Sequence, residues 1–189
     1  MATEIELERT YLLKSLPSNL QDYPSEIIHD IYIPDSVFHP HLRLRHRGDR
    51  FEMTKKVPIL DNDSSKMFEH TIELEKEEFD ALAKSSNKDI KKRRYTIDVD
   101  GRKAELDVYM DKLEGLAVID FEFDDEAQMR TFPMPDIALA DVTQDETTAA
   151  GYLAGKSIAD IAPRLEKYGF VTDEIGAYVS SAISKDGAA

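Results

Sequence analysis

The sequence predicts an α+β fold in which an antiparallel sheet is followed by helices. Two observations lead to this prediction. Polar and apolar residues alternate with period two in at least six segments before residue 124, a pattern typical of strands with one buried face. Beyond that point apolar residues recur at helical spacing, as at Ile158, Ile161 and Leu165. We expect a single domain over residues 1–189, with a strand-rich core to about 123 and a helical part from 124 to 189.

The composition of the chain excludes several classes of partner and of metal site. The 189 residues carry a formal net charge of -14, with 38 acidic against 24 basic side chains, which argues against nucleic acid or an anionic membrane as partner. The chain has no cysteine, so disulfides and thiolate metal sites are excluded. It has no apolar run typical of a signal peptide or membrane helix, and we expect a cytoplasmic protein. A metal would be held by carboxylates or by the 5 histidines, which favours hard ions.

The first predicted strand, residues 4–12, carries a row of carboxylates. Glu4, Glu6, Glu8 and Thr10 fall on one face because successive side chains of a strand point in opposite directions. Like charges in a row repel one another, so this face requires cations nearby. The alternative is an edge strand whose charged face is simply solvated.

The later strands repeat the alternation with both signs of charge. A strand at 27–34 precedes a hairpin of 39–47 and 50–57 around Gly48-Asp49. Further strands are expected at 68–74, 90–99, 103–109 and 116–123. Their polar faces carry Arg43, Arg45, Arg47, Arg50, Glu52, Thr54, Lys56, Glu69, Glu73, Lys92, Arg94, Glu105, Asp107, Asp120 and Glu122.

Helices are expected between and after these strands. The predicted segments are 75–84, 125–132, 145–153, 157–168 and 173–183. Ser157 and Asp160 form a capping-box pattern at the start of one of them.

Two arrangements satisfy this pattern. A flat antiparallel sheet would leave its charged face in water, whereas a sheet closed into a barrel would enclose the charges and carry helices outside. Enclosed charges are costly unless they pair or bind ions, so a closed barrel would imply a binding tunnel. In the barrel, the outward-facing residues would be Leu44, Met53, Ile72, Leu106, Val108, Ile119 and Phe121.

The two signs of charge indicate a ligand. Arginine and lysine suit phosphate oxygens, and clustered carboxylates suit a divalent metal that coordinates the same phosphates. A metal–polyphosphate complex uses both sets, and a carboxylate can orient or deprotonate an attacking water.

Five short motifs occur in a characteristic order: ELERTYLL, the RLR of HLRLRHRGD followed by EMTKK, then KRRY, ELDVY and IDFEF. In this order they resemble the CYTH superfamily, or triphosphate tunnel metalloenzymes, over roughly residues 1–155. That family has a closed eight-stranded antiparallel β-barrel tunnel with helices packed outside. It includes inorganic triphosphatases, thiamine triphosphatases and class IV adenylate cyclases.

The resemblance implies roles for ten residues. Metal ligands, for Mg²⁺ or Mn²⁺, would be Glu6, Glu8, Asp107, Asp120 and Glu122, and Glu6 and Glu8 would also be catalytic. A triphosphate-containing small molecule would be bound by Arg43, Arg45, Lys56, Lys92 and Arg94.

The chain departs from the family signature Glu-x-Glu-x-Lys, because Thr10 stands in place of the lysine. Residues 145–150 also lack the tyrosine and asparagine common in bacterial relatives. We therefore expect a metal-dependent hydrolase of inorganic triphosphate, or of another triphosphate compound, with weak activity.

Three alternatives differ in class. The main one is a non-catalytic tunnel that binds polyphosphate or a nucleotide. The others are cyclisation of ATP, although no motif marks an adenine pocket, and an acidic sheet protein without a ligand. The oligomeric state is left open, a homodimer included.

Overall fold

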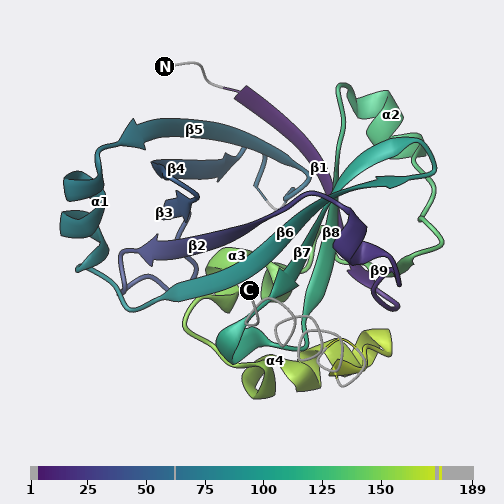
Figure 1. Ribbon diagram of the computed structural model, residues 1–189. Helices are drawn as coiled ribbons and strands as arrows, with labels where there is room; N and C mark the ends of the chain where they lie inside the picture. The colour runs from purple at the N-terminus through teal and green to yellow at the C-terminus, as the bar shows by residue number, and fades with distance from the viewer. Residues whose placement is uncertain (1–3, 62, 173–174, 176–189) are drawn as a thin grey trace.

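The computed structural model describes residues 4–61, 63–172 and 175. Its centre is a closed antiparallel barrel of eight strands, which Figure 1 shows in a view roughly along the barrel axis. The strands are β1 (Glu4–Leu13), β2 (Ser25–Ile33), β3 (Leu42–Arg47), β4 (Arg50–Pro58), β5 (Lys66–Leu74), β6 (Asp89–Val99), β7 (Arg102–Tyr109) and β8 (Ala117–Glu122). The prediction of a closed barrel is confirmed, and the flat sheet is excluded.

Strand β1 closes the barrel because it pairs on both sides. The order around the sheet is β5-β4-β3-β2-β6-β7-β8-β1, and β1 pairs again with β5. Its first half, from Glu4 to Leu7, lies against β5, whereas Glu8 to Leu12 lies against β8. Its last residues also pair with a short strand, β9 (Ala138–Asp141), which the sequence pattern did not predict.

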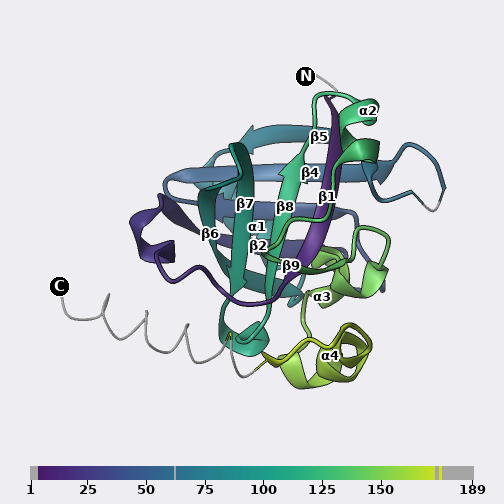
Figure 2. The same cartoon turned by 90° about the vertical axis from the view of Figure 1, so that its right-hand side faces the viewer.

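The helices lie outside the barrel (Figures 1 and 2). They are α1 (Lys76–Ala83), α2 (Glu126–Thr131), α3 (Ala150–Leu153) and α4 (Ile158–Leu165). The expected helices at 75–84, 125–132 and 157–168 are confirmed, and α4 begins with the predicted capping box of Ser157 and Asp160. The segment 145–153 is instead a 3-10 turn followed by the single turn of α3. The helix expected at 173–183 falls largely outside the described residues.

Apolar side chains on the outer face of the barrel form the core. Leu106, Ile119 and Phe121 are fully buried in a cluster that also contains Met129 of α2 and Ile161 of α4. This core therefore lies between the sheet and the helices, and the barrel interior is left to other side chains.

Leu44 on β3 belongs to a second apolar cluster, which includes Phe79 of α1. Met53 packs against it, whereas Ile72 is only half-buried. Val108 lies in the first cluster. The predicted outward side of the strands is thus confirmed, with incomplete cover at Ile72. Within the described residues, the structure contains no helix that is long and apolar enough to span a membrane.

Replacing Leu106 with Ala tests the position of the core. Leu106 is 0% exposed, and emptying such a site costs about 2–5 kcal/mol of unfolding free energy because a cavity remains. Ile5 is 60% exposed, so Ile5→Ala should change stability by no more than about 0.5 kcal/mol. Chemical denaturation of both variants checks the prediction, and equal losses would contradict it.

Candidate active site

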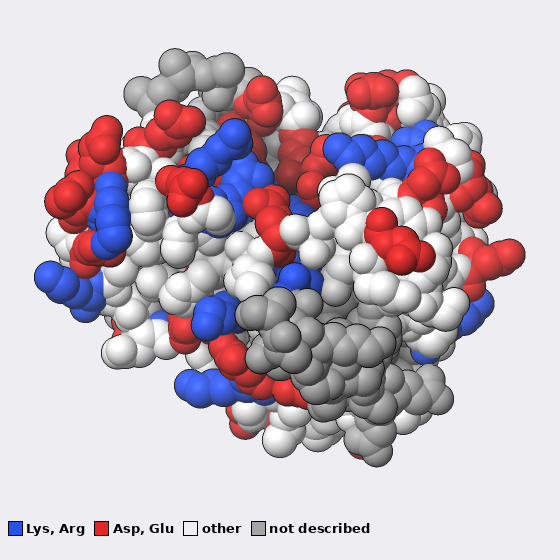
Figure 3. Space-filling view, viewed as in Figure 1, with Lys and Arg blue, Asp and Glu red and all other residues white. Residues whose placement is uncertain are grey.

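The barrel encloses a cavity of about 510 Å³. Its lining includes all ten residues that the sequence singled out as site candidates, together with Thr10. In the space-filling view along the same direction as Figure 1, basic and acidic surfaces lie side by side around a recess in the upper part of the molecule (Figure 3).

The two sets of site candidates come from different parts of the barrel wall. The candidate phosphate ligands lie on β3, β4 and β6 (Arg43, Arg45, Lys56, Lys92 and Arg94), which we call the basic wall. The candidate metal ligands lie on the consecutive strands β7, β8 and β1 (Asp107, Asp120, Glu122, Glu6 and Glu8), which we call the acidic wall. This separation follows from strand order, which alternation alone does not specify.

Asp107 joins the two walls. It is 1% exposed, and Arg94 donates to both of its oxygens, with Nε–Oδ1 and Nη2–Oδ2 distances of 2.7 Å. Lys92 also donates to Asp107, and Arg94 reaches Glu105. Burial alone would raise the pKa of Asp107, but Arg94 and Lys92 outweigh it and hold that pKa well below its usual range. Asp107 therefore fixes the two cations, and its role as a metal ligand stays a prediction.

Arg45 is fixed by a partner that sequence reasoning missed. Asp30 on β2 is 0% exposed and accepts from Arg45 at 2.7 Å and 2.8 Å, to Nε and Nη2. Burial favours the neutral acid, but the guanidinium keeps the pKa of Asp30 below its usual range. A signal was present, since Asp30 is the one acidic residue within the β-branched run 27–33.

Arg43 differs from its neighbours on the basic wall. Its Nε atom is buried and has no hydrogen-bond partner among the described residues. A buried donor on a cation costs free energy unless it finds an acceptor. Its position in the cavity lining therefore suits an anionic ligand that supplies oxygens.

The acidic wall carries more charge than its cations compensate. Glu8 lies directly opposite Glu122, and Thr10 opposite Asp120, across β1 and β8. Burial, together with the charge of Glu8, raises the pKa of Asp120 well above its usual value. Burial and Glu105 also raise the pKa of Glu122. These carboxylates hold protons more tightly than in water, because burial and neighbouring carboxylates outweigh the cations within reach, such as Arg94 at 3.8 Å from Asp120.

The pKa of Glu6 is also raised, and it lies close to physiological pH. Burial and the neighbouring Glu8 raise its pKa to about 7, even though Lys56 donates a hydrogen bond to it. Lys56 also lies 3.3 Å from Glu69. Burial alone would lower the pKa of Lys56, but the surrounding carboxylates raise it, so this side chain stays charged.

Thr10 links two of the acids through its hydroxyl. Its Oγ1 donates to Asp120 Oδ1 at 2.7 Å and lies 3.4 Å from Glu8 Oε1. A hydroxyl has one proton to donate, so the shorter contact takes it. Thr10 thus orders Asp120 without adding positive charge.

A divalent cation would meet suitable donors here. The acidic wall offers only oxygen ligands, which Mg²⁺ and Mn²⁺ prefer, and its raised pKa values are those that a bound cation would lower. In the described part of the chain, no group of three or more acidic or histidine side chains is already arranged as a coordination site. The donor chemistry fits the ion, and Glu8, Asp120 and Glu122 are the side chains that would hold it.

One part of the cavity wall is formed by a loop and α3. His39 and His41 lie in the lining with their rings 5.0 Å apart. Gly151 approaches so closely that a Cβ there would come within 2.6 Å of the Pro40 carbonyl oxygen. A larger residue at 151 would push α3 away, so this glycine sets how tightly the wall closes.

Comparison with solved structures finds chains of the same fold. The chain resembles the solved structure described as the inorganic triphosphatase NE1496, with a TM-score of 0.58 and 25% identity over 82% of this chain and 95% of that one. A second structure of NE1496, described as a hypothetical protein, gives a TM-score of 0.59 and 25% identity over 80% and 99%. The chain has the CYTH fold.

A conserved hypothetical protein from Pyrococcus furiosus aligns over 90% of this chain and 94% of its own, with 16% identity and a TM-score of 0.45. Neither a protein-family model nor a curated protein matches the sequence.

The raised pKa of Glu6 predicts a pH-dependent stability. An acid whose pKa rises on folding, here from 4.5 to about 7, contributes stability at low pH that is lost as the pH increases through that interval. Over this interval the parent should lose about 3 kcal/mol relative to Glu6→Gln, which cannot titrate. Denaturation of both proteins between pH 4 and about 8 measures the difference. A difference that stays constant with pH would contradict the assignment.

Proposed function

We propose that this protein is a divalent-metal-dependent hydrolase that cleaves a phosphoanhydride bond of inorganic triphosphate or of another triphosphate compound. The observation that carries the proposal is a closed barrel whose cavity has a basic wall facing an acidic wall. The resemblance to a structure described as an inorganic triphosphatase supports it.

The basic wall would bind the phosphate chain. Among the described residues, Arg43 has a buried donor without a partner, and Arg45 and Arg94 are held in place by Asp30 and Asp107. Guanidinium groups fixed in this way bind phosphate oxygens with little loss of side-chain entropy. They also balance charge that develops on the oxygens as the bond breaks.

The acidic wall would bind the metal ion and accept a proton from the attacking water. Mg²⁺ or Mn²⁺ bound there would neutralise phosphate charge and polarise the reacting phosphoryl group. Glu6 has a pKa of about 7, so near neutral pH its ionised form can accept the proton of a water molecule. The water oxygen bonds to the terminal phosphorus, the bridging P–O bond breaks, and the proton goes to Glu6 or Glu8. The products are orthophosphate and pyrophosphate, or the corresponding diphosphate compound.

A second candidate is a tunnel that binds polyphosphate or a nucleotide without cleaving it. Thr10 favours this alternative, because it supplies a neutral hydroxyl where a lysine would add a cation beside Glu8 and Asp120. Phosphate release from tripolyphosphate, with and without Mg²⁺ or Mn²⁺, separates the two candidates.

Replacing Glu122 with Gln tests the metal assignment. The substitution keeps the shape of the side chain but removes a negative charge from the acidic wall. Metal-stimulated phosphate release should fall by about a hundredfold or more, because transition-state charge loses its balance, while the fold is kept. Glu4→Gln makes the same charge change at an exposed position on β1 and should retain the parent rate. Hydrolysis by Glu122→Gln at the parent rate would show that the assignment is wrong.

Replacing Thr10 with Lys tests the cause of weak activity. An ammonium group beside Glu8 and Asp120 should raise turnover of tripolyphosphate, by up to about a hundredfold, because one well-placed charge contact is worth that much. Thr10→Val loses the hydroxyl without gaining a charge, and it should show no increase. Steady-state rates at saturating metal compare the three proteins. A folded Thr10→Lys protein that is slower than the parent would mean that the site depends on the threonine.

A further inference from the structure

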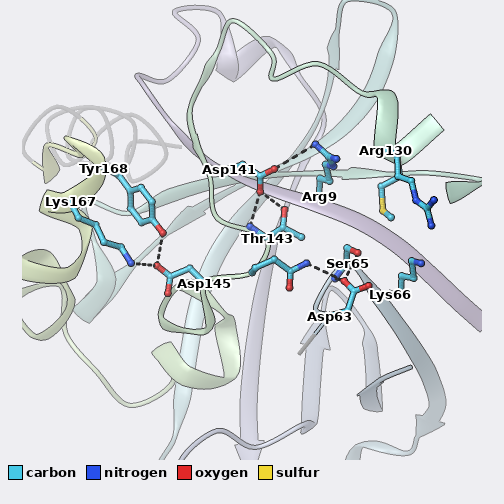
Figure 4. A pocket seen from close by; sticks show the side chains of 12 residues that line it. Arg9, Asp63, Ser65, Lys66, Arg130, Asp141, Thr143, Asp145, Lys167 and Tyr168 are labelled. Carbon is cyan, nitrogen blue, oxygen red and sulfur yellow. Dashed lines mark hydrogen bonds and ion pairs between the residues drawn. The ribbon is translucent and has the colours of Figure 1, made fainter. Parts of the chain in front are cut away.

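A second hollow lies outside the barrel, with a volume of about 680 Å³. We call it the outer groove (Figure 4). Its lining draws one cation from each of four elements: Arg9 from β1, Lys66 from β5, Arg130 from α2 and Lys167 from the turn at 166–168. In Figure 4, Lys167 lies at one end of the groove and Arg130 and Lys66 lie toward the other. The cations are therefore spread along it.

The outer groove and the barrel cavity share part of their lining. Asp63, Thr143 and Asp145 line both. The two segments that separate the hollows are joined by the side chain of Gln144, which donates to Asp63 Oδ1 at 3.1 Å and accepts from the Ser64 backbone N–H at 3.0 Å. These hydrogen bonds are exposed, and each contributes little free energy. The wall between the two hollows is therefore held together here only by weak bonds.

Each cation of the groove is ion-paired, and Arg130 and Lys167 are the exposed ones, at 70% and 55%. Lys167 lies 2.8 Å from Asp145, and Arg9 lies 3.6 Å from Asp141. Lys66 and Arg130 share Glu126, at 2.8 Å and 2.6 Å. An exposed pair such as Arg130–Glu126 contributes little free energy in water, whereas Lys66 and Arg9 are only 14% and 26% exposed. Phosphate oxygens can therefore bind the exposed ammonium of Lys167 and guanidinium of Arg130 without a large loss, beside the more buried Lys66 and Arg9.

The arrangement favours an extended anion over a compact one. A single phosphate is bound best by cations that converge on one point, whereas here they come from four elements along a groove. Three carboxylates share the lining, Asp63, Asp141 and Asp145, so the groove, like the barrel cavity, mixes both signs. Such a mixture suits a polyanion that brings its own metal counterions.

We propose that the outer groove binds the distal part of a linear condensed phosphate whose end lies in the barrel cavity. The inference rests on the proposed function, because it extends the substrate from triphosphate to longer polyphosphate chains. On this proposal the groove adds affinity for a long chain that extends beyond the cavity, and adds none for a triphosphate held within it.

The double variant Lys167→Gln/Arg130→Gln tests the proposal in the full-length protein. Both side chains are exposed, at 55% and 70%, and lie outside the barrel. Affinity for long-chain polyphosphate, measured by titration calorimetry, should fall about tenfold, because two exposed charge contacts are lost. Binding and hydrolysis of tripolyphosphate should not change. Lys76→Gln/Lys84→Gln removes the same charge from α1, on the opposite side of the barrel in Figure 1, and should leave both affinities unchanged.

The outcomes separate this inference from the proposed hydrolysis. Equal long-chain affinity in the parent and in Lys167→Gln/Arg130→Gln would overturn the groove site. An equal loss in Lys76→Gln/Lys84→Gln would overturn it as well, because the effect would then be one of net charge. A single-stranded oligonucleotide that binds as tightly, with the same dependence on Lys167 and Arg130, would overturn the assignment to phosphate chains. A selective loss of long-chain binding in a protein that hydrolyses neither ligand would support the groove and contradict the hydrolase.

Discussion

The structure depends on pairing of charges inside a closed barrel. Arg94 and Lys92 share Asp107, and Arg45 is bound by Asp30, all with little exposure to solvent. Removing one partner from such a pair costs about 3–5 kcal/mol, because the other charge is left buried alone. The apolar core lies outside the strands, so the fold can keep this polar interior only while the pairs persist. The same pairs hold the cations of the basic wall in place before any ligand arrives.

The buried charges of the cavity are not all balanced by a partner of opposite sign, and the unbalanced ones indicate what the cavity binds. On the basic wall, most cations have a buried carboxylate, whereas Arg43 keeps a buried donor without a partner among the described residues. On the acidic wall, Glu6, Asp120 and Glu122 all have raised pKa values, because burial and neighbouring carboxylates outweigh the cations within reach. The basic wall lacks an acceptor at Arg43, and the acidic wall lacks positive charge. A phosphate chain bound together with a divalent metal would supply both, whereas Thr10 adds no positive charge to the acidic wall.

The sequence predicted those parts of the structure that follow from local periodicity. Alternation in β1, β3 and β6 identified which side chains face inward, and the capping box of Ser157 and Asp160 located α4. Alternation does not specify strand order, so the division into two walls came only from the closed sheet. Asp30 was not predicted as a site residue because one acid within the β-branched run 27–33 forms no charged row, and β9 was not predicted because its four residues are too short to show a period. The outer groove depends on contacts between distant segments, such as Gln144 with Asp63, for which the sequence holds no signal.

The central claim is that the two walls bind a metal–triphosphate complex in a fixed orientation. The most direct test is a crystal structure of the protein with tripolyphosphate and Mn²⁺, in which anomalous scattering locates the metal. The account predicts an anomalous peak beside Glu8, Asp120 and Glu122, with the phosphate chain between that peak and the guanidinium groups of Arg43 and Arg45. A metal bound elsewhere would contradict it. So would a structure in which the phosphate chain lies only outside the barrel cavity.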